Sequence, residues 1–166
     1  MRKLIIVLVM LCATCTAISV GATHLQQERQ EKSTRFGPLT VDADKRLLFQ
    51  GRPLKPEIGG NNSLDLGEVF RVGDADIVLV TDNGGMGCPF LYYFITITEM
   101  GAKATRAFGT CAEVERLKRT GGTFSLVMSG YRGPMEPRKA QEKAARETHV
   151  FTFRDGKLLE DGVPVK

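Results

Sequence analysis

The sequence contains no tryptophan and only two histidines, His24 and His149. A Ser-His-Asp or Cys-His catalytic device needs a histidine held beside its nucleophile, and only His149 lies well away from the N-terminus. A zinc site needs three or four His, Cys or carboxylate ligands, and no motif groups them here. We therefore expect no metal, no other cofactor and no nucleophilic triad.

Two further patterns resemble ligand sites without meeting their requirements. Asp74, Asp76, Asp82 and Asn83 flank one predicted strand, but their spacing matches no EF-hand calcium loop. Residues 84–87 are rich in glycine, but no Lys-Ser/Thr pair follows to make a phosphate-binding loop. We interpret both as turn-forming segments. No pair of carboxylates of the kind used in glycoside hydrolysis stands out in the sequence, although the number of acidic residues would allow such a pair.

Only one long hydrophobic run occurs, and it is at the N-terminus. Met1-Arg2-Lys3 precedes an uncharged stretch, Leu4–Leu11, and small residues follow. This is the pattern of a secretory signal peptide, and the run is about half the ~20 residues that a spanning helix needs. We predict cleavage after Ala17 or Ala22, with residues 1–22 as signal peptide, 23–35 as a flexible polar leader and 36–166 as one domain. The mature protein would be periplasmic or secreted, with no stable membrane span.

The charge balance gives no support for a polyanionic partner. The chain has 23 basic and 19 acidic residues, a net charge of +4. Loss of Arg2 and Lys3 with the signal peptide leaves 21 basic residues against the same 19 acidic ones, a net of +2. We therefore expect no nucleic-acid partner.

Four cysteines become two on export, because Cys12 and Cys15 belong to the signal peptide. Cys88 and Cys111 remain, in a compartment where disulfides persist. If the chain between them folds as a hairpin about Glu99–Met100, Phe94 lies opposite Thr105 and Cys88 opposite Cys111. Residues directly opposite have Cβ atoms ~4.5–5.5 Å apart, close to the distance that a disulfide spans. We predict a Cys88–Cys111 disulfide, with two free thiols as the alternative.

The rest of the chain is typical of a mainly β protein. Short strand-like segments alternate with turns rich in Gly, Asn and Asp. They include Leu39–Val41, Arg46–Phe49, Glu68–Val72, Asp76–Val80, Phe90–Thr98, Lys103–Gly109, Thr123–Met128 and Val150–Phe153. Arg138–Thr148 alone is rich in helix formers. We expect a single antiparallel β-sandwich or strongly curved sheet of about eight strands, with one or two short surface helices.

One sequence pattern occurs twice, over residues 46–55 and 157–166. Each copy has a basic residue, two leucines, a polar-glycine pair, a proline, an aliphatic residue and a final lysine in the same order. A duplicated hairpin unit would explain this pattern. Convergence of unrelated strand-turn-strand segments is the alternative.

A candidate protein-binding surface lies in the long loop over residues 129–138. It contains Tyr131, Arg132, Met135 and Arg138, which belong to residue types enriched at protein interfaces. An ordinary connector with scattered apolar groups is the alternative interpretation.

The motifs Gly84-Gly85-Met86-Gly87-Cys88-Pro89 and Phe108-Gly109-Thr110-Cys111, joined by an aromatic strand, resemble a pattern in small exported proteins of Gram-negative bacteria without a settled function. The resemblance covers residues 47–131 and implies a periplasmic address, with no catalytic residue. We therefore expect a non-enzymatic module that binds another protein of the cell envelope, as an inhibitor or immunity-type protein against an envelope-targeting toxin or hydrolase. An envelope hydrolase with a carboxylate site, or a structural accessory subunit of an envelope complex, are the alternatives.

Overall fold

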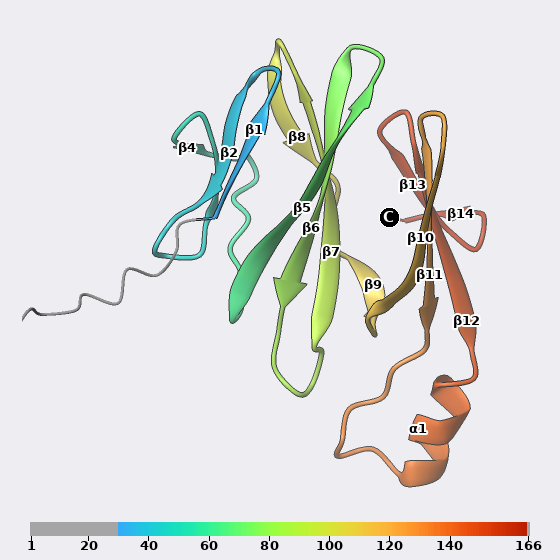
Figure 1. Cartoon of the computed structure of the whole chain (residues 1–166). Coiled ribbons are helices and arrows are strands. Elements are labelled where there is room, and N and C mark those ends of the chain that lie inside the picture. The colour runs from blue at the N-terminus through green and yellow to red at the C-terminus, as the bar shows by residue number, and fades with distance from the viewer. Residues whose placement is uncertain (1–29, 166) are drawn as a thin grey trace, which may run out of the picture.

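The computed structural model describes residues 30–165, which form three stacked antiparallel β-sheets (Figure 1). An N-terminal sheet and a C-terminal sheet cover opposite faces of a central sheet. One short helix, α1 (Arg138–Ala144), lies below the C-terminal sheet in this view. The predicted signal peptide and most of the predicted leader lie outside the described residues.

Each sheet is built mainly from hairpins of strands that follow one another in the chain. The N-terminal sheet contains, in spatial order, β1 (Glu31–Thr34), β2 (Gly37–Val41), β3 (Leu47–Phe49) and β4 (Arg52–Pro53). The central sheet contains β5 (Ser63–Val72), β6 (Ala75–Asn83), β7 (Phe90–Thr98) and β8 (Gly101–Ala104), with β9 (Phe108–Cys111) also paired to β7. The C-terminal sheet contains β10 (Val114–Thr120), β11 (Thr123–Ser129), β12 (Thr148–Arg154), β13 (Lys157–Glu160) and β14 (Val163–Pro164).

The central strands β6 and β7 are apolar on both faces, and this explains the three layers. Successive side chains of a strand point to opposite faces of its sheet. On β6, Ile77 packs towards the C-terminal sheet while Val78 and Val80 pack towards the N-terminal sheet. On β7, Phe94 and Ile95 divide in the same way, and all five side chains are buried. Such strands are stable only when both faces of their sheet are covered.

The two interfaces differ in chemistry. The interface with the N-terminal sheet contains mainly aliphatic side chains: Leu39, Val41, Leu47, Leu54, Ile58, Leu64, Leu66, Val78, Val80, Ile95 and Ile97. The interface with the C-terminal sheet is centred on Phe94, whose ring stacks 4.3 Å from that of Phe153 and 5.5 Å from that of Phe108. Phe124 and Phe151 complete this aromatic cluster. In a chain without tryptophan, these packed phenylalanine rings supply large aromatic side chains to the core on this side of the central sheet.

The prediction of a mainly β chain is confirmed, but the strands are more numerous than expected. The described residues form fourteen strands in three sheets, in place of about eight in one sandwich or curved sheet. Several of the additional strands, such as β4 and β14, are only two residues long and depend on the hairpin partner before them. Strands this short leave no alternating pattern in a sequence.

The predicted helix is present in a shorter form. It spans Arg138–Ala144 after Pro137, and the chain has returned to a strand at Thr148, where the sequence predicted the helix to end. Ala144 is its one buried residue, in agreement with the lack of an apolar stripe. Within residues 30–165, no helix has the length and apolar character that crossing a membrane requires.

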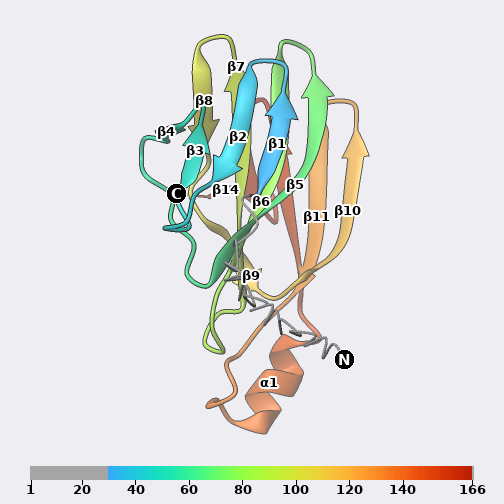
Figure 2. The ribbon, with the colours of Figure 1, turned by 60° about the vertical axis from the view of Figure 1, so that its left-hand side comes forward.

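The last residues of the predicted leader belong to the fold. β1 lies beside β5 (Figure 2), where the Gln30 side chain binds the Asp65 carboxylate and the backbone N–H of Leu66. Next to β1, the Arg35 guanidinium donates to the fully buried carboxylate of Asp76, with Nε 2.8 Å from Oδ1. The backbone N–H of Arg35 donates to the second carboxylate oxygen. The domain therefore begins before Phe36, because a polar segment supplies the partner of a buried charge.

The repeated sequence pattern corresponds to a repeated structure. Leu48 pairs with Pro53 in β3–β4, and Leu159 pairs with Pro164 in β13–β14. Both turns have two successive residues with positive φ, Gln50-Gly51 and Asp161-Gly162, as a two-residue hairpin of type I′ requires. The two equivalent hairpins end the two outer sheets, on opposite sides of the central sheet.

We predict that Arg35→Ala lowers the free energy of unfolding by about 3 kcal/mol, because it leaves the buried Asp76 carboxylate without its cation. Urea denaturation followed by circular dichroism measures the change. Arg46→Ala is the control, since Arg46 pairs with Asp42 and Asp44 at a more exposed site and should cost about 1 kcal/mol or less. Equal urea midpoints for the two variants would contradict the prediction.

Candidate functional site

The predicted partner-binding loop lies at one end of the molecule, against a second loop. The first loop, residues 130–137, joins β11 to α1, and the second, residues 84–89, joins β6 to β7 (Figure 1). We call these two loops together the loop end. The central and C-terminal sheets hold the two loops from opposite sides, so segments far apart in the sequence meet there.

The predicted disulfide attaches the second loop to β9. Cys88 and Cys111 are bonded, with Cα atoms 4.7 Å apart. The predicted register is correct where β7 begins to pair with β8, because Thr98 lies opposite Gly101 and Thr105 Oγ1 accepts the backbone N–H of Phe94.

The register then changes before the cysteines. Residues 105–107 interrupt the edge strand between β8 and β9, and β9 resumes with Phe90, not Cys88, opposite Cys111. Cys88 lies in the turn that precedes β7. The disulfide therefore joins a strand to a turn, and the prediction of directly opposed cysteines is wrong in this detail. An irregularity in a ladder cannot be recognised from the pattern of apolar residues alone.

Tyr92 supports the segment that follows Cys111. Its hydroxyl accepts the backbone N–H of Val114 at 3.1 Å and donates to the carbonyl of Ala112 at 3.4 Å. Burial raises the pKa of Tyr92, so the phenol stays protonated and available as a donor. Sequence analysis did not single out Tyr92, which lies inside a strand that is uniformly rich in aromatic residues.

The loop over residues 130–137 is anchored at three points. The Gly130 N–H donates to the carbonyl of Glu147, and the Tyr131 hydroxyl donates to the carbonyl of Met86 in the neighbouring loop. The Gln141 side chain of α1 donates to the carbonyl of Glu136 at 2.7 Å. The first bond connects the loop to the start of β12, the second to the loop that contains Cys88 and the third to the helix.

The four predicted contact residues have different surroundings. Tyr131 is half-buried and uses its hydroxyl within the protein, whereas Arg132 is exposed. Met135 is 97% exposed, and Arg138 forms an ion pair with Glu142 one helical turn away. The structure thus joins Tyr131 to the 84–89 loop and places Arg138 on the helix, separate from it.

Met86 is a residue of this end that sequence analysis overlooked. Its side chain is 78% exposed in the glycine-rich loop. The sequence offered one indication of an exposed contact residue here, a single large apolar side chain among three glycines. A turn does not need such a side chain.

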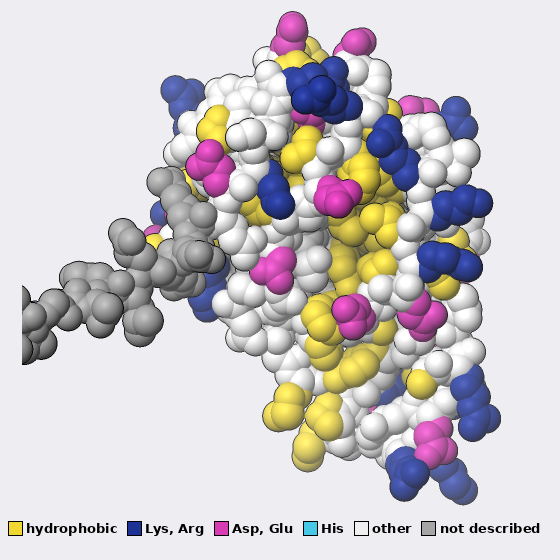
Figure 3. Space-filling model, viewed as in Figure 1, with side chains coloured by type: hydrophobic (Ala, Val, Ile, Leu, Met, Phe, Trp, Pro, Cys, Tyr) yellow, Lys and Arg dark blue, Asp and Glu magenta, His cyan; other side chains and the backbone are white. Residues whose placement is uncertain are grey.

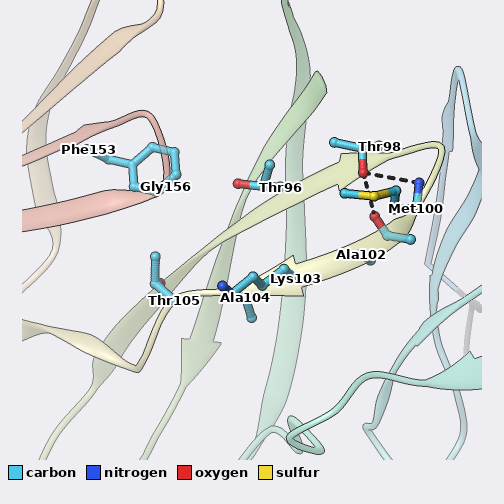
Figure 4. A pocket seen from close by; sticks show the side chains of 10 residues that line it. Thr96, Thr98, Met100, Ala102, Lys103, Ala104, Thr105, Phe153 and Gly156 are labelled. Atoms are coloured by element: carbon cyan, nitrogen blue, oxygen red, sulfur yellow. Dashed lines mark hydrogen bonds between the residues drawn. The ribbon is translucent and has the colours of Figure 1, made fainter. Parts of the chain in front are cut away.

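A cavity of about 360 Å³ lies at the opposite end, between the β7–β8 hairpin and the turn that joins β12 to β13 (Figure 4). Small residues, threonines, Met100 and Phe153 line it, and Lys103 carries the one charge among these lining residues. Thr98 closes the hairpin turn by bonding the N–H of Met100 and the carbonyl of Gly101. This cavity has no carboxylate pair of the kind that hydrolysis of a glycosidic bond uses.

Three of the four side chains that were predicted to flank one strand lie within β6 and have structural partners. Asp76 binds Arg35, Asp82 accepts the N–H of Asn61, and Asn83 donates to Ser63 and Asp65. Asp74 lies in the turn before β6 and Asp82 and Asn83 at the end of the strand, as interpreted from the sequence, but the interpretation is wrong for Asp76, which is a fully buried strand residue paired with a cation.

Comparison of the chain with protein-family models, with curated proteins and with solved structures found no match. The resemblance to small exported proteins therefore stays a prediction.

We predict that the paired substitution Cys88→Ser and Cys111→Ser lowers the free energy of unfolding by about 3 kcal/mol. Without the cross-link, the unfolded chain regains the conformational entropy that closing residues 88–111 into a loop removes. Urea denaturation measures the change, and mass spectrometry without reductant tests for the bond in the wild type. A reducing agent should destabilise the wild type to the level of the variant and leave the variant unchanged. Two thiols that react with an alkylating agent in the folded wild type would contradict the prediction.

Proposed function

We propose that the protein is an exported, periplasmic, non-enzymatic module that binds another protein of the envelope through its loop end. In its most concrete form it is an inhibitor or immunity-type protein that blocks an envelope-targeting toxin or hydrolase. The observation that carries this proposal is the hydrogen bond from Tyr131 to the carbonyl of Met86. It connects the loop over residues 130–137 to a loop that a disulfide attaches to β9 at Cys88.

The connection matters because loops usually lose conformational freedom when they bind. A surface whose loops are already held in place avoids part of this entropic cost. The disulfide, the Tyr131 bond and the Gly130 bond all restrict the loop end before a partner arrives.

The loop end also exposes apolar side chains that a partner could cover. Met86 and Met135 are two of the five large hydrophobic residues that are exposed among residues 30–165. Hydrophobic side chains are visible below the central sheet in Figure 3. Methionine is flexible and polarisable, so it adapts to the shape of a partner. α1 and the segment after it, which follow the loop over residues 130–137 in the chain, carry charged side chains: Lys139, Glu142, Lys143, Arg146 and Glu147. An apolar centre with a charged rim is the usual anatomy of a protein interface.

The alternative of an accessory subunit is favoured by one observation, the edge strand β10. Residues 115–120 are exposed along their whole length, and β10 pairs with β11 on one side only. Such an edge can accept a strand from a partner. However, Glu115, Arg116, Lys118 and Arg119 lie on it, and charged side chains are a common protection against edge-to-edge pairing. The loop end is therefore the better-supported surface.

We predict that the combined change Met86→Ser and Met135→Ser weakens binding to a partner at least tenfold, because it removes the apolar contacts of the loop end. The partner is first captured from a periplasmic extract on the immobilised protein and is then purified, so that its affinity can be measured by calorimetry. Met100→Ser is the matched control, because Met100 is 98% exposed at the opposite end of the central sheet. Equal affinities for all three proteins would exclude the loop end.

We further predict that Tyr131→Phe weakens the same complex, because it retains the ring and removes the bond to Met86. Combined Tyr131→Ala and Arg132→Ala substitutions should weaken it more. An unchanged affinity in both variants would show that the Tyr131 loop does not contribute. Recovery of no partner, together with hydrolytic activity of the purified protein, would favour the envelope hydrolase instead.

A further inference from the structure

Three side chains with metal-ligand chemistry meet on the C-terminal sheet. His149 lies at the start of β12, Glu160 at the end of β13 and Asp161 in the turn that follows. The Nδ1 atom of His149 is 3.4 Å from Oε1 of Glu160 and 3.4 Å from Oδ2 of Asp161. One ligand atom from each residue lies within 4.8 Å of the other two.

Strand pairing brings these residues together. Phe151 lies opposite Glu160, and His149 points to the same face of β12 as Phe151, because side chains two residues apart share a face. Asp161 is held by the backbone of β12: its Oδ1 accepts the N–H of Val150 and its own N–H donates to the Val150 carbonyl. Its second carboxylate oxygen is thus directed to His149.

The distances do not describe a satisfied hydrogen bond. Charge-assisted N–H···O bonds are usually ~2.7–2.9 Å long. The Nδ1 atom is enclosed by protein and has no hydrogen-bond partner among the described residues. Buried polar atoms are rarely left in this state. A single Nδ1–H also could not donate to both carboxylates with good geometry.

The two distances from Nδ1 fit the ligands of one small cation, and one oxygen of each carboxylate lies within 4.8 Å of the other. A tetrahedral zinc ion binds His nitrogen and carboxylate oxygen at ~2.0–2.2 Å, which places its ligand atoms about 3.4 Å from one another. Two carboxylates would balance the charge of a divalent ion. An imidazole nitrogen favours zinc and its neighbours in the first transition row over calcium or magnesium, which prefer oxygen ligands.

We propose that His149, Glu160 and Asp161 form a binding site for Zn²⁺. Three protein ligands leave a fourth position for water or for a group on another molecule. The side chains of Glu160 and Asp161 are 45% and 50% exposed, so an ion approaches through the two carboxylates, because the Nδ1 atom itself is enclosed. This site revises the expectation that the protein binds no metal, and it does not depend on the proposed partner-binding function.

Titration of the purified, disulfide-bonded protein with zinc chloride tests the proposal. Calorimetry should show one ion bound per chain, and zinc should raise the melting temperature. Asp161→Asn should weaken zinc at least tenfold while the metal-free protein keeps its melting temperature, because asparagine still accepts the Val150 N–H and tolerates the positive φ of this position. Glu160→Gln and His149→Gln should have the same effect on binding.

Two control variants separate this site from zinc bound elsewhere. Asp155→Asn changes another turn aspartate with positive φ, and His24→Gln changes the other histidine of the chain. Both should bind zinc as the wild type does, and zinc should shift the imidazole proton resonances of His149 and not those of His24. The proposal would be overturned if the protein did not bind zinc, or if the His149→Gln variant still bound it. The three side chains would then form only an ion pair between His149 and the two carboxylates.

Discussion

The structure depends on a central pair of strands that is apolar on both faces. β6 and β7 bury Val78 and Ile95 on one side and Ile77 and Phe94 on the other. A sheet of this kind cannot leave either face in water, so the chain before it and the chain after it each form a covering sheet. The order of the layers follows from the order of the segments in the sequence.

The features that suggest function lie where this layered scaffold needs its connections. The loop end arises because the turn before β7 and the connection from β11 to α1 leave their sheets at the same end of the molecule. The His149 cluster arises at the rim of the β12–β13 hairpin, where the aromatic core gives way to polar side chains. In both places a rigid sheet positions a few exposed groups, as is usual for sites carried on loops and strand ends.

The sequence predicted contacts between residues of one hairpin better than contacts between residues that are far apart in the chain. The strand Phe90–Thr98 and the Cys88–Cys111 bond were predicted because each depends on neighbouring residues or on a single hairpin. The His149 cluster could have been found by pairing Val150–Phe153 with the segment after residue 156 as a hairpin and extending its register by a few residues.

Two other contacts had no comparable signal. Arg35 binds Asp76 across 41 positions, and Tyr131 binds Met86 across 45. In each pair one partner lies in a polar or glycine-rich segment whose pattern is that of a surface connector. Only the stacking of separate sheets brings these residues together, and no periodicity in the sequence encodes that stacking.

The equivalent hairpins at the two ends of the domain have a consequence for its origin. Each belongs to a three-stranded meander, β2–β3–β4 or β12–β13–β14, with the same pairing and the same turn. Copying one meander to the far end of a gene would produce this arrangement. Later divergence would then follow the face that each copy covers, aliphatic towards the N-terminal sheet and aromatic towards the C-terminal sheet.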